Sequence, residues 1–505
     1  MGDIELLKIK NVESAELGSV PVLGIKDFRS TVVEYVSKGR RLSSFFAAPL
    51  DNRIRFFAIL SNDADGYVEI ISAIAENTFE SLTPDVPSAH LFEREIYEQF
   101  GIIPEGHPRL KPVRFQNKVY NRISGKYVES KKICGVADFF EVKGEEIHEV
   151  AVGPVHAGII EPGHFRFQCF GEVVLNLEIL LGYQHRGIER NLIGGPDERT
   201  IYYMEAVAGD TTIGHTLAYC QAIESLAGVN ATSRGQALRA VALELERLAN
   251  HTGDLGALAN DVGFLPTASF CGRLRGDFLN MTALLCGSRF GRGFIRPGGV
   301  TFDLLPDKTG QLVDKIKKTY EHVEGAVNLL WNTSSVRARF ENVGFLSREE
   351  CIKFGIVGPA ARAGGLEIDV RRDHPFGQYC FSQIPVSTHL AGNVFARAYV
   401  RWLEIKRSAE FLIEILSAIP PENIRTKPPK QLARNAIVVS LVEGWRGEIC
   451  HTVITDKNGR IAYYKIVDPS FHNWTGLELA MRNQQISDFP LCNKSFNLSY
   501  CGFDL

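Results

Sequence analysis

Residues 233–260 of the chain read SRGQALRAVALELERLANHTGDLGALAN, and this stretch decides the fold class of the larger part of the protein. Leu238, Ala242 and Leu245 recur three or four residues apart, which is the spacing of one apolar helix face. Ser233 is a suitable N-cap residue at the start of the pattern. The stretch therefore predicts a long helix that packs into a core.

A line of polar side chains runs along the same stretch, at Glu244, Arg247, His251 and Asp254. These residues also lie three or four apart, so a helix would bring them onto one face. Such a line is commonly a solvated surface with salt bridges. Inside a large helical domain it would instead be a buried polar seam. The sequence does not decide between these two interpretations.

Two further helices are predicted beyond this stretch, over residues 307–332 and 389–417. Residues 436–467 alternate between apolar and polar side chains, and the turn sequence Asp-Lys-Asn-Gly stands at 456–459. This combination predicts a β-hairpin. From residue 151 onward the chain is therefore expected to be mainly helical, with small β-sheets.

The first 115 residues predict a small α/β unit. Helical patterns at 27–37 and 91–100 flank strand-like runs at 54–60 and 67–71. Prolines make the stretch 104–114 extended, because each of them breaks a helix. The polar residues 116–145 read as a linker that leads into a strand at 145–152. The predicted organisation is α+β, with a domain over 1–115, a linker over 116–145 and a second domain over 146–505.

Composition excludes several classes of protein. The chain has 505 residues, of which 45% are hydrophobic and 23% charged, so it is globular and not disordered. A net charge of −3 argues against binding nucleic acid through phosphate neutralisation. None of the ten cysteines lies three positions from another as CxxC, which excludes the usual zinc-ribbon, ferredoxin and thioredoxin-like signatures.

The sequence carries no sign of a targeting or membrane segment. The first 20 residues lack a basic segment followed by an apolar core, as a secretory signal would have. The longest apolar stretches, 173–181 and 411–419, are interrupted by polar residues and fall far short of the roughly 20 residues of a membrane span. A cytoplasmic chain is expected, and docking onto a membrane complex stays compatible with this.

Three short stretches concentrate polar chemistry: GPVHAGIIEPGHFR at 153–166, GYQHRGIER at 182–190 and EGWRGE at 443–448. A carboxylate beside an Arg or His can exchange a proton when burial tunes its pKa. The same groups can equally form an ion-pair network that fixes loops. No HExxH or HxH motif and no nearby Cys accompanies the histidines, and neither GxGxxG nor GxxxxGK[ST] occurs, so metal and nucleotide binding are not indicated.

At these motifs the sequence resembles a known family. Residues 146–505 resemble the large subunit of energy-converting (group 4) nickel–iron hydrogenases and the homologous 49-kDa-type subunit of respiratory complex I. Residues 90–115 resemble the signature of the 30-kDa-type subunit, which some hydrogenases carry in front of the large subunit. The resemblance implies those two folds for the two domains. It rests on GPVHAGIIEPGHFRF, YQHRGIE, LELERLANH, FIRPGGV, RRDHPFGQY, EGWRGE and DPS, in this order.

The chain departs from the hydrogenases at the metal ligands. The family pattern VCGICxxxH reads VAGDTTIGH here, with Ala208 and Thr211 at the cysteine positions. The later pattern DPCxxC reads DPSFHN, with Ser470 and Asn473 at the cysteine positions. Since thiolates are the soft donors that hold nickel and iron, the resemblance implies a chain that binds no metal and no other cofactor itself.

The chain also departs from complex I. The tyrosine that helps hold quinone there has its best match at Gly209, and the two loop histidines lie eight residues apart where complex I has four. The remaining polar positions match proton-relay or site residues of the two families. The resemblance implies a proton or acceptor cavity formed by Glu189, His164, His156, Asp261, Arg446 and Glu443.

The function implied is that of a hydrogenase-related subunit without a nickel–iron centre in a membrane-attached, ion-translocating redox complex. An iron–sulfur small subunit would carry a [4Fe-4S] cluster and pass electrons, and membrane antiporter-like and anchor subunits would move ions. The chain would lie at the cytoplasmic, inner face of the membrane. Two alternatives stay open: a quinone or small-acceptor reductase of the complex I type, a family associated with NAD and quinone binding, and a non-catalytic scaffold subunit.

Overall fold

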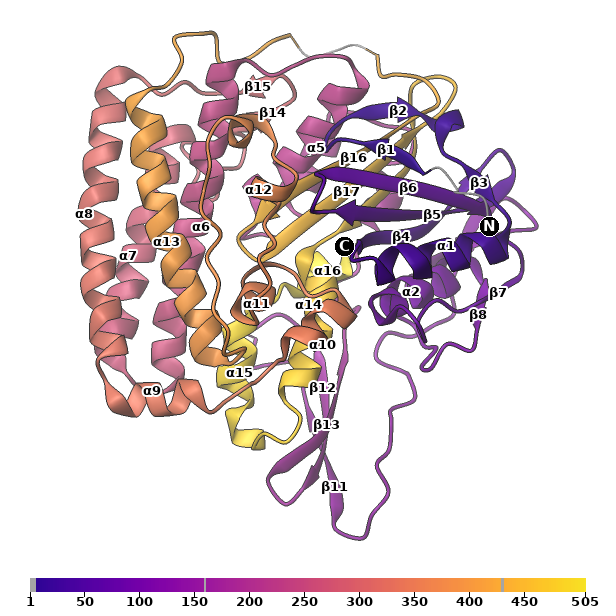
Figure 1. Cartoon of the computed structure of the whole chain (residues 1–505), viewed down its shortest axis with the longest axis horizontal. Helices are drawn as coiled ribbons and strands as arrows, with labels where there is room; N and C mark the ends of the chain where they lie inside the picture. The colour runs from indigo at the N-terminus through magenta and orange to yellow at the C-terminus, as the bar shows by residue number, and fades with distance from the viewer. Residues whose placement is uncertain (1–5, 159, 428–430) are drawn as a thin grey trace.

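The computed structural model describes residues 6–158, 160–427 and 431–505. Four long helices lie side by side at one end of the molecule, and the larger sheets lie at the other (Figure 1). Neighbouring helices contact one another around a ring, so they form a four-helix bundle. The predicted helix over 233–260 is confirmed. The bundle consists of α6 (Ser233–Asp261), α7 (Leu265–Cys286), α8 (Pro306–Trp331) and α13 (Val394–Ser417).

The helix ends follow local capping chemistry. The Thr232 side chain accepts a hydrogen bond from Gly235 N at 3.0 Å, so Thr232 caps α6 in place of the predicted Ser233. The predicted start of the last bundle helix at residue 389 is wrong by several residues. Asn393 Oδ1 accepts a hydrogen bond from Ala396 N at 2.9 Å, and this cap begins α13 only at Val394.

The N-terminal sheet is buried on both faces. On one face, Phe56 packs against Phe28 of α1, with ring centroids 6.2 Å apart. On the other face, Phe46 stacks on Tyr463 at 5.5 Å. This explains why residues 56–60 of the strand-like run at 54–60 are all apolar. The unit contains β1 (Leu7–Ile9), β3 (Val22–Leu23), α1 (Ile25–Ser37), β4 (Arg41–Leu50), β5 (Arg53–Asn62), β6 (Tyr67–Ile74), β7 (Thr78–Glu80), α2 (His90–Phe100) and β8 (Ile103–Glu105).

A second sheet joins the two ends of the chain. Its order is β18 (Ile461–Val467), β17 (Gly447–Thr455), β16 (Ala436–Gly444) and β2 (Ser14–Glu16). The predicted hairpin is β17–β18, and Gly459 takes a φ of 73° in its turn. Because β2 pairs with β16, residues 1–115 are not a self-contained unit, in contrast to the simple division expected from the sequence.

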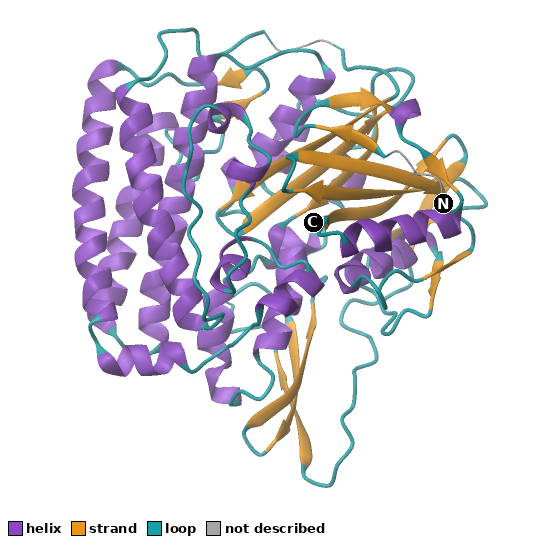
Figure 2. Cartoon of the chain, in the orientation of Figure 1, coloured by secondary structure: helices purple, strands orange, loops and turns teal. Residues whose placement is uncertain are grey.

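The segment between the domains is partly ordered into strands. The predicted linker contains a hairpin of β9 (Lys118–Asn121) and β10 (Lys126–Glu129). After it, β11 (Ile147–Val152), β12 (His164–Phe170) and β13 (Val173–Leu180) form a separate sheet that projects from the body (Figure 2). Among the described residues, no helix is long and apolar enough to cross a membrane.

The remaining helices pack around the sheets and the bundle and complete the mixed α+β fold that the sequence predicts. They are η1 (Leu17–Ser19), η2 (Pro87–Ala89), α3 (Ile188–Asn191), α4 (Thr200–Glu205), α5 (Thr212–Leu226), α9 (Ser334–Glu341), α10 (Arg348–Phe354), α11 (Gly358–Ala363), α12 (Val370–Asp373), η3 (Gly377–Cys380), α14 (Pro469–Ala480), η4 (Ile486–Asp488), α15 (Phe489–Phe496) and α16 (Tyr500–Asp504), with β14 (Ile295–Arg296) and β15 (Gly299–Val300) as a small ribbon.

Candidate functional site

An ion pair occupies the place where the first cysteine pair of the resembling hydrogenases would stand. Arg446, in the turn between β16 and β17, donates to both carboxylate oxygens of Asp210, at 2.6 and 2.7 Å. It also donates to Thr211 Oγ1 at 3.3 Å. Burial raises the pKa of Asp210, but the Arg446 guanidinium outweighs it and holds that pKa below its ordinary value. Ala208 is fully buried beside them.

Ser470 and Asn473, at the positions of the second cysteine pair, form hydrogen bonds with other groups of the protein. Ser470 Oγ accepts a hydrogen bond from Ser499 N at 2.8 Å. Asn473 Oδ1 accepts from Val357 N at 2.9 Å, and Asn473 Nδ2 donates to Val357 O at 3.1 Å. The next residue, Gly358, has a φ of 67°, and a Cβ there would lie 2.1 Å from Arg446 O. Asn473 thus holds the loop against which the Arg446 turn packs.

A buried chain of hydrogen bonds links the start of α5, which follows the first replaced cysteine pair, to Asp468, which precedes the second. His215 Nε2 lies 3.0 Å from Asp468 Oδ2, and His215 Nδ1 lies 3.1 Å from His451 Nε2. His451 Nδ1 in turn lies 2.9 Å from Tyr464 Oη. Burial raises the pKa of Asp468, but His215 and Arg446 outweigh it, so the pKa stays below its ordinary value. The ends of α5 and α14 are therefore adjacent, as a metal site built from both would require.

The residues at this place do not fit a nickel–iron centre. A methyl group, two hydroxyl groups and an amide replace the four soft anionic donors that such a centre needs. The three polar replacements are also engaged in hydrogen bonds within the protein. Within the described ranges, no group of three or more His, Cys, Asp or Glu side chains is arranged to hold a metal ion.

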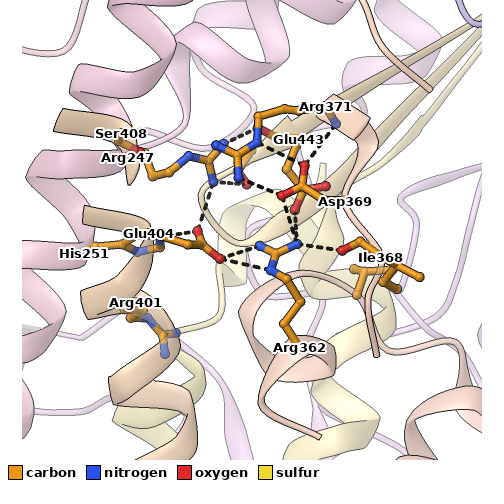
Figure 3. A network of polar contacts seen from close by, with 12 residues as sticks. Arg247, His251, Arg362, Ile368, Asp369, Arg371, Arg401, Glu404, Ser408 and Glu443 are labelled. Atoms are coloured by element: carbon orange, nitrogen blue, oxygen red, sulfur yellow. Dashed lines mark hydrogen bonds and ion pairs between the residues drawn. The ribbon is translucent and has the colours of Figure 1, made fainter. Parts of the chain in front are cut away.

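Next to this place lies a buried network of charges (Figure 3). Glu404 of α13 lies at its centre and accepts a hydrogen bond from Arg362 Nε at 2.9 Å, with Arg362 Nη2 at an ion-pair distance of 2.7 Å. The same carboxylate contacts His251 Nε2 at 2.8 Å and Arg247 at 3.5 Å, both on α6. The polar line of the long helix is therefore a buried seam, and the alternative of a solvated surface is wrong. The cause is that α6 is packed by other elements along this face.

The other half of the network extends to β16, in the sheet that joins the two ends of the chain. Asp369 contacts Arg371 at 2.6 Å, and Arg371 reaches Glu244 of α6 at 3.1 Å. Glu443 of β16 accepts from Arg362 Nη1 at 2.8 Å and from Val370 N at 3.1 Å. Burial raises the pKa of Glu443 to about 7, and the negative charge of Asp369 adds to this effect.

Glu189 lies in a different cluster, at the boundary between the two domains. Its Oε1 accepts from Ile466 N at 2.9 Å and lies 3.1 Å from Lys465 Nζ. Lys465 also binds both carboxylate oxygens of Glu95 on α2, at 2.6 and 2.7 Å. Arg114 contacts the same Glu95 carboxylate. A cavity of about 20 Å³ adjoins Glu189, and none of the other five predicted site residues lines it.

The structure does not bring the six predicted site residues into one cavity. His156 and His164 lie in the β11–β12 region, where they contact Gly163 O at 2.9 Å and Gly153 O at 3.4 Å. Asp261 is exposed at the end of α6 and makes no salt bridge among the described residues. On the same helix, Asp254 is buried and binds Arg401 at 2.8 Å.

Sequence reasoning missed several residues of these clusters. Asp210 stands between the two replaced cysteine positions, and its charge at a normally apolar position was the available signal. Arg362 and Glu404 lie outside the quoted motifs, and only tertiary contacts show their role. Glu95 and Lys465 come from different domains, so no local pattern connects them.

Comparisons with known proteins agree with this architecture. Residues 261–439 match the family model of the respiratory-chain NADH dehydrogenase 49 Kd subunit, and residues 35–121 match that of the 30 Kd subunit. The chain is 28% identical to formate hydrogenlyase subunit 5 of Escherichia coli, covering 84% of this chain and 76% of the relative.

Two further relatives show the same range of proteins. The carbon monoxide-induced hydrogenase of Rhodospirillum rubrum is 29% identical over 69% of this chain and 97% of its own length. The C/D subunit of the NADH-quinone oxidoreductase of Bacteroides thetaiotaomicron is 28% identical over 72% of this chain and 75% of its own. With matches to both the 30 Kd and the 49 Kd family models, the chain is similar to group 4 hydrogenase-related, complex I-like subunits.

Proposed function

We propose that this chain is a hydrogenase-related subunit that holds no nickel–iron centre and works in a membrane-attached, ion-translocating redox complex. Electrons would arrive from a [4Fe-4S] cluster in an adjacent iron–sulfur small subunit. Their arrival would be coupled to proton movement through the polar interior of this chain. Membrane antiporter-like and anchor subunits would move the ions, with this chain at the cytoplasmic face of the membrane.

The observation that carries the proposal is the Asp210–Arg446 ion pair. A buried guanidinium needs a compensating negative charge, because leaving it unpaired costs several kcal/mol. Asp210 supplies that charge at 2.6 Å, at the position where thiolates would otherwise stand. Thr211, Ser470 and Asn473 meanwhile bond to protein groups. The place is thus filled from within the chain.

The buried network supports the second half of the proposal. Charges sealed in a protein interior seldom stabilise the fold more than apolar packing would, so fold stability alone does not account for them. Groups with strongly shifted pKa values can exchange protons near neutral pH. Glu443 is such a group, and it is connected through Arg362 to Glu404 and His251.

A specific feature favours reduction of a quinone or another small acceptor as a second candidate function. His164 Nε2 is buried and has no hydrogen-bond partner among the described residues; with Nδ1 facing Gly153 O as donor, Nε2 could accept a hydrogen bond from a hydroxyl group of a reduced acceptor such as a quinol. Val155 and Ile160, in the adjoining loop, expose 75% and 55% of their surface. Relatives of the chain are named NADH-quinone oxidoreductase subunits.

Assays on the intact purified complex separate these functions. With reduced methyl viologen as electron donor, the complex in sealed vesicles is tested for hydrogen evolution with protons as acceptor, for quinone reduction with an added quinone, and for ion movement with an added soluble dye as electron acceptor. The proposal expects no hydrogen evolution, and ion movement that Glu189→Gln abolishes while the complex stays assembled. Hydrogen evolution would contradict it. Quinone reduction lost on His164→Ala would favour the second candidate. Full ion movement in an assembled Glu189→Gln complex would favour a scaffold role.

A further inference from the structure

The charge inventory of the buried network does not balance. Four carboxyl groups meet three guanidinium groups and one imidazole, and none of these side chains exposes more than 4% of its surface. With every carboxyl ionised and the imidazole neutral, the network carries one net negative charge. The members are Glu244, Asp369, Glu404, Glu443, Arg247, Arg362, Arg371 and His251.

The charged groups around the network do not correct this imbalance. Asp254 pairs with Arg401 at 2.8 Å, and Asp373 pairs with Arg372 at 2.6 Å. Arg397, a turn away from Arg401 on α13, is a buried guanidinium with no salt bridge among the described residues; it donates to Ser495 Oγ and two carbonyl oxygens and pairs with no carboxyl group of the network.

Toward β16 and β17, the neighbouring charged groups among the described residues supply no unpaired cation to the network either. Glu448, directly opposite Glu443 on β17, binds Arg41 at 2.7 Å. Arg41 in turn is shared with Asp63, which also contacts His374 at 3.0 Å. An unbalanced charge in a sealed interior is strongly unfavourable, and binding one proton would neutralise it.

His251 is a poor place for that proton. Its Nε2 lies 2.8 Å from Glu404, so it can donate there as a neutral imidazole. Its Nδ1 is buried and has no hydrogen-bond partner among the described residues. Protonation would add a second N–H donor at that atom with nothing to accept it, which is costly. Burial accordingly lowers the pKa of His251.

Among the carboxyl groups, Glu443 is the least compensated. Glu404 contacts two guanidinium groups and an imidazole, and Glu244 contacts two guanidinium groups and two hydroxyl groups. Glu443 has one guanidinium nitrogen, Arg362 Nη1, together with the Val370 backbone N–H. That same nitrogen lies 3.6 Å from Asp369.

We infer that Glu443 carries one exchangeable proton at and below neutral pH, in a pair with Asp369 that shares Arg362. Glu443 is then the position at which the buried network gains or releases a proton. The bond formed is one carboxyl O–H, and the proton comes from and returns to water. The protonation follows from the charge inventory alone, whereas its use during turnover rests on the function proposed above.

Infrared spectroscopy tests the inference on the purified full-length chain. A protonated carboxyl group has a C=O stretching band that shifts in heavy water. The wild-type minus Glu443→Gln difference spectrum removes the contribution of other buried acids. We expect this band at about pH 6 and its loss by about pH 9. Its absence from the difference spectrum at both pH values would overturn the inference.

Comparing Glu443→Gln with two further variants, Glu404→Gln and Asp369→Asn, locates the proton and controls for folding. Glu443→Gln replaces a neutral acid by a neutral amide, so its thermal midpoint at pH 6 is expected to stay close to that of the wild type. Glu404→Gln removes a charge shared by Arg247, Arg362 and His251 and is expected to lower the midpoint strongly. A band that survives Glu443→Gln but vanishes in Asp369→Asn would place the proton on Asp369 and overturn the assignment.

The protonation and the proposed function can fail separately. If the infrared band is assigned to Glu443 but the Glu443→Gln complex moves ions as the wild type does, then Glu443 is protonated but its proton is not used in turnover. Hydrogen evolution by the complex would overturn the proposed function and leave the infrared result untouched.

Discussion

Arg446, in the turn between β16 and β17, and Asp210, just before α5, form a two-bond ion pair with N–O distances of 2.6 and 2.7 Å, beside the starts of α5 and α14, which a metal centre would otherwise join. Asp468 and His215, at 3.0 Å, connect the same two helix ends from inside the core. The family's metal position is therefore bridged by the chain's own charges. The predictions below follow from this arrangement and from the buried network beside it.

Asp210→Asn should destabilise the fold, because Arg446 would lose the charge that compensates it. The Asp210 side chain is 34% exposed, so we expect a loss of ~1–3 kcal/mol, below that for a fully buried pair. Denaturant unfolding measures the change. Asp314→Asn, at an exposed position of α8 without a salt bridge among the described residues, is the matched control and should have no measurable effect. Equal effects from both variants would show that the ion pair contributes nothing.

Asn473→Ala should also destabilise the chain, by ~2 kcal/mol, because Val357 N and O would both be left buried without partners. Asn260→Ala, an exposed change near the end of α6, is the control. Thermal unfolding of the two variants gives the comparison. A harmless Asn473→Ala would mean that this residue does not hold the loop behind Arg446.

The stability of the wild type should fall as pH rises toward neutrality, in part because of Glu443. Its pKa in the folded state is about 7, above the ordinary value of 4.5, so the folded state binds this proton more tightly than the unfolded state. The resulting stabilisation is fully present below the ordinary pKa and is lost as pH rises through about 7. Glu443→Gln should remove ~1–3 kcal/mol of this pH dependence. Parallel stability curves from about pH 5 to 8 would contradict the prediction.

Glu95→Gln should weaken the contact between the two domains. Glu95 is 2% exposed and binds Lys465 and Arg114, so its neutralisation leaves two buried cations with Glu189 as their nearest acidic partner. We expect a loss of ~3 kcal/mol and faster cleavage within residues 116–145 under limited proteolysis. Glu76→Gln, on the exposed surface of the same domain, is the control. Equal cleavage rates would indicate that the cluster does not hold the domains together.

The sequence predicted the elements of the fold better than the composition of the site. Helix periodicity identified α6, because 3.6-residue spacing is a local property. The same pattern could not tell a solvated line of charges from a buried seam, since burial depends on α13, α11 and β16, which come much later in the chain.

The predicted cavity shows the same limit more sharply. Glu189, Glu443 and Arg446 lie in separate clusters, and Asp261 lies in none of them. Motif matching finds residue types in order along the chain, whereas these clusters depend on contacts such as that between Lys465 and Glu95, 370 positions apart. The replaced cysteines could be found from sequence because each motif is short and local.

The proposed function requires a subunit that has a buried polar interior and holds no nickel. Its most direct test is the nickel content of the intact purified complex by elemental analysis, expressed per copy of this chain. Iron is not diagnostic, because a partner's iron–sulfur cluster would supply it. The account predicts nickel far below one atom per chain and no hydrogen uptake. One nickel atom per chain would contradict it.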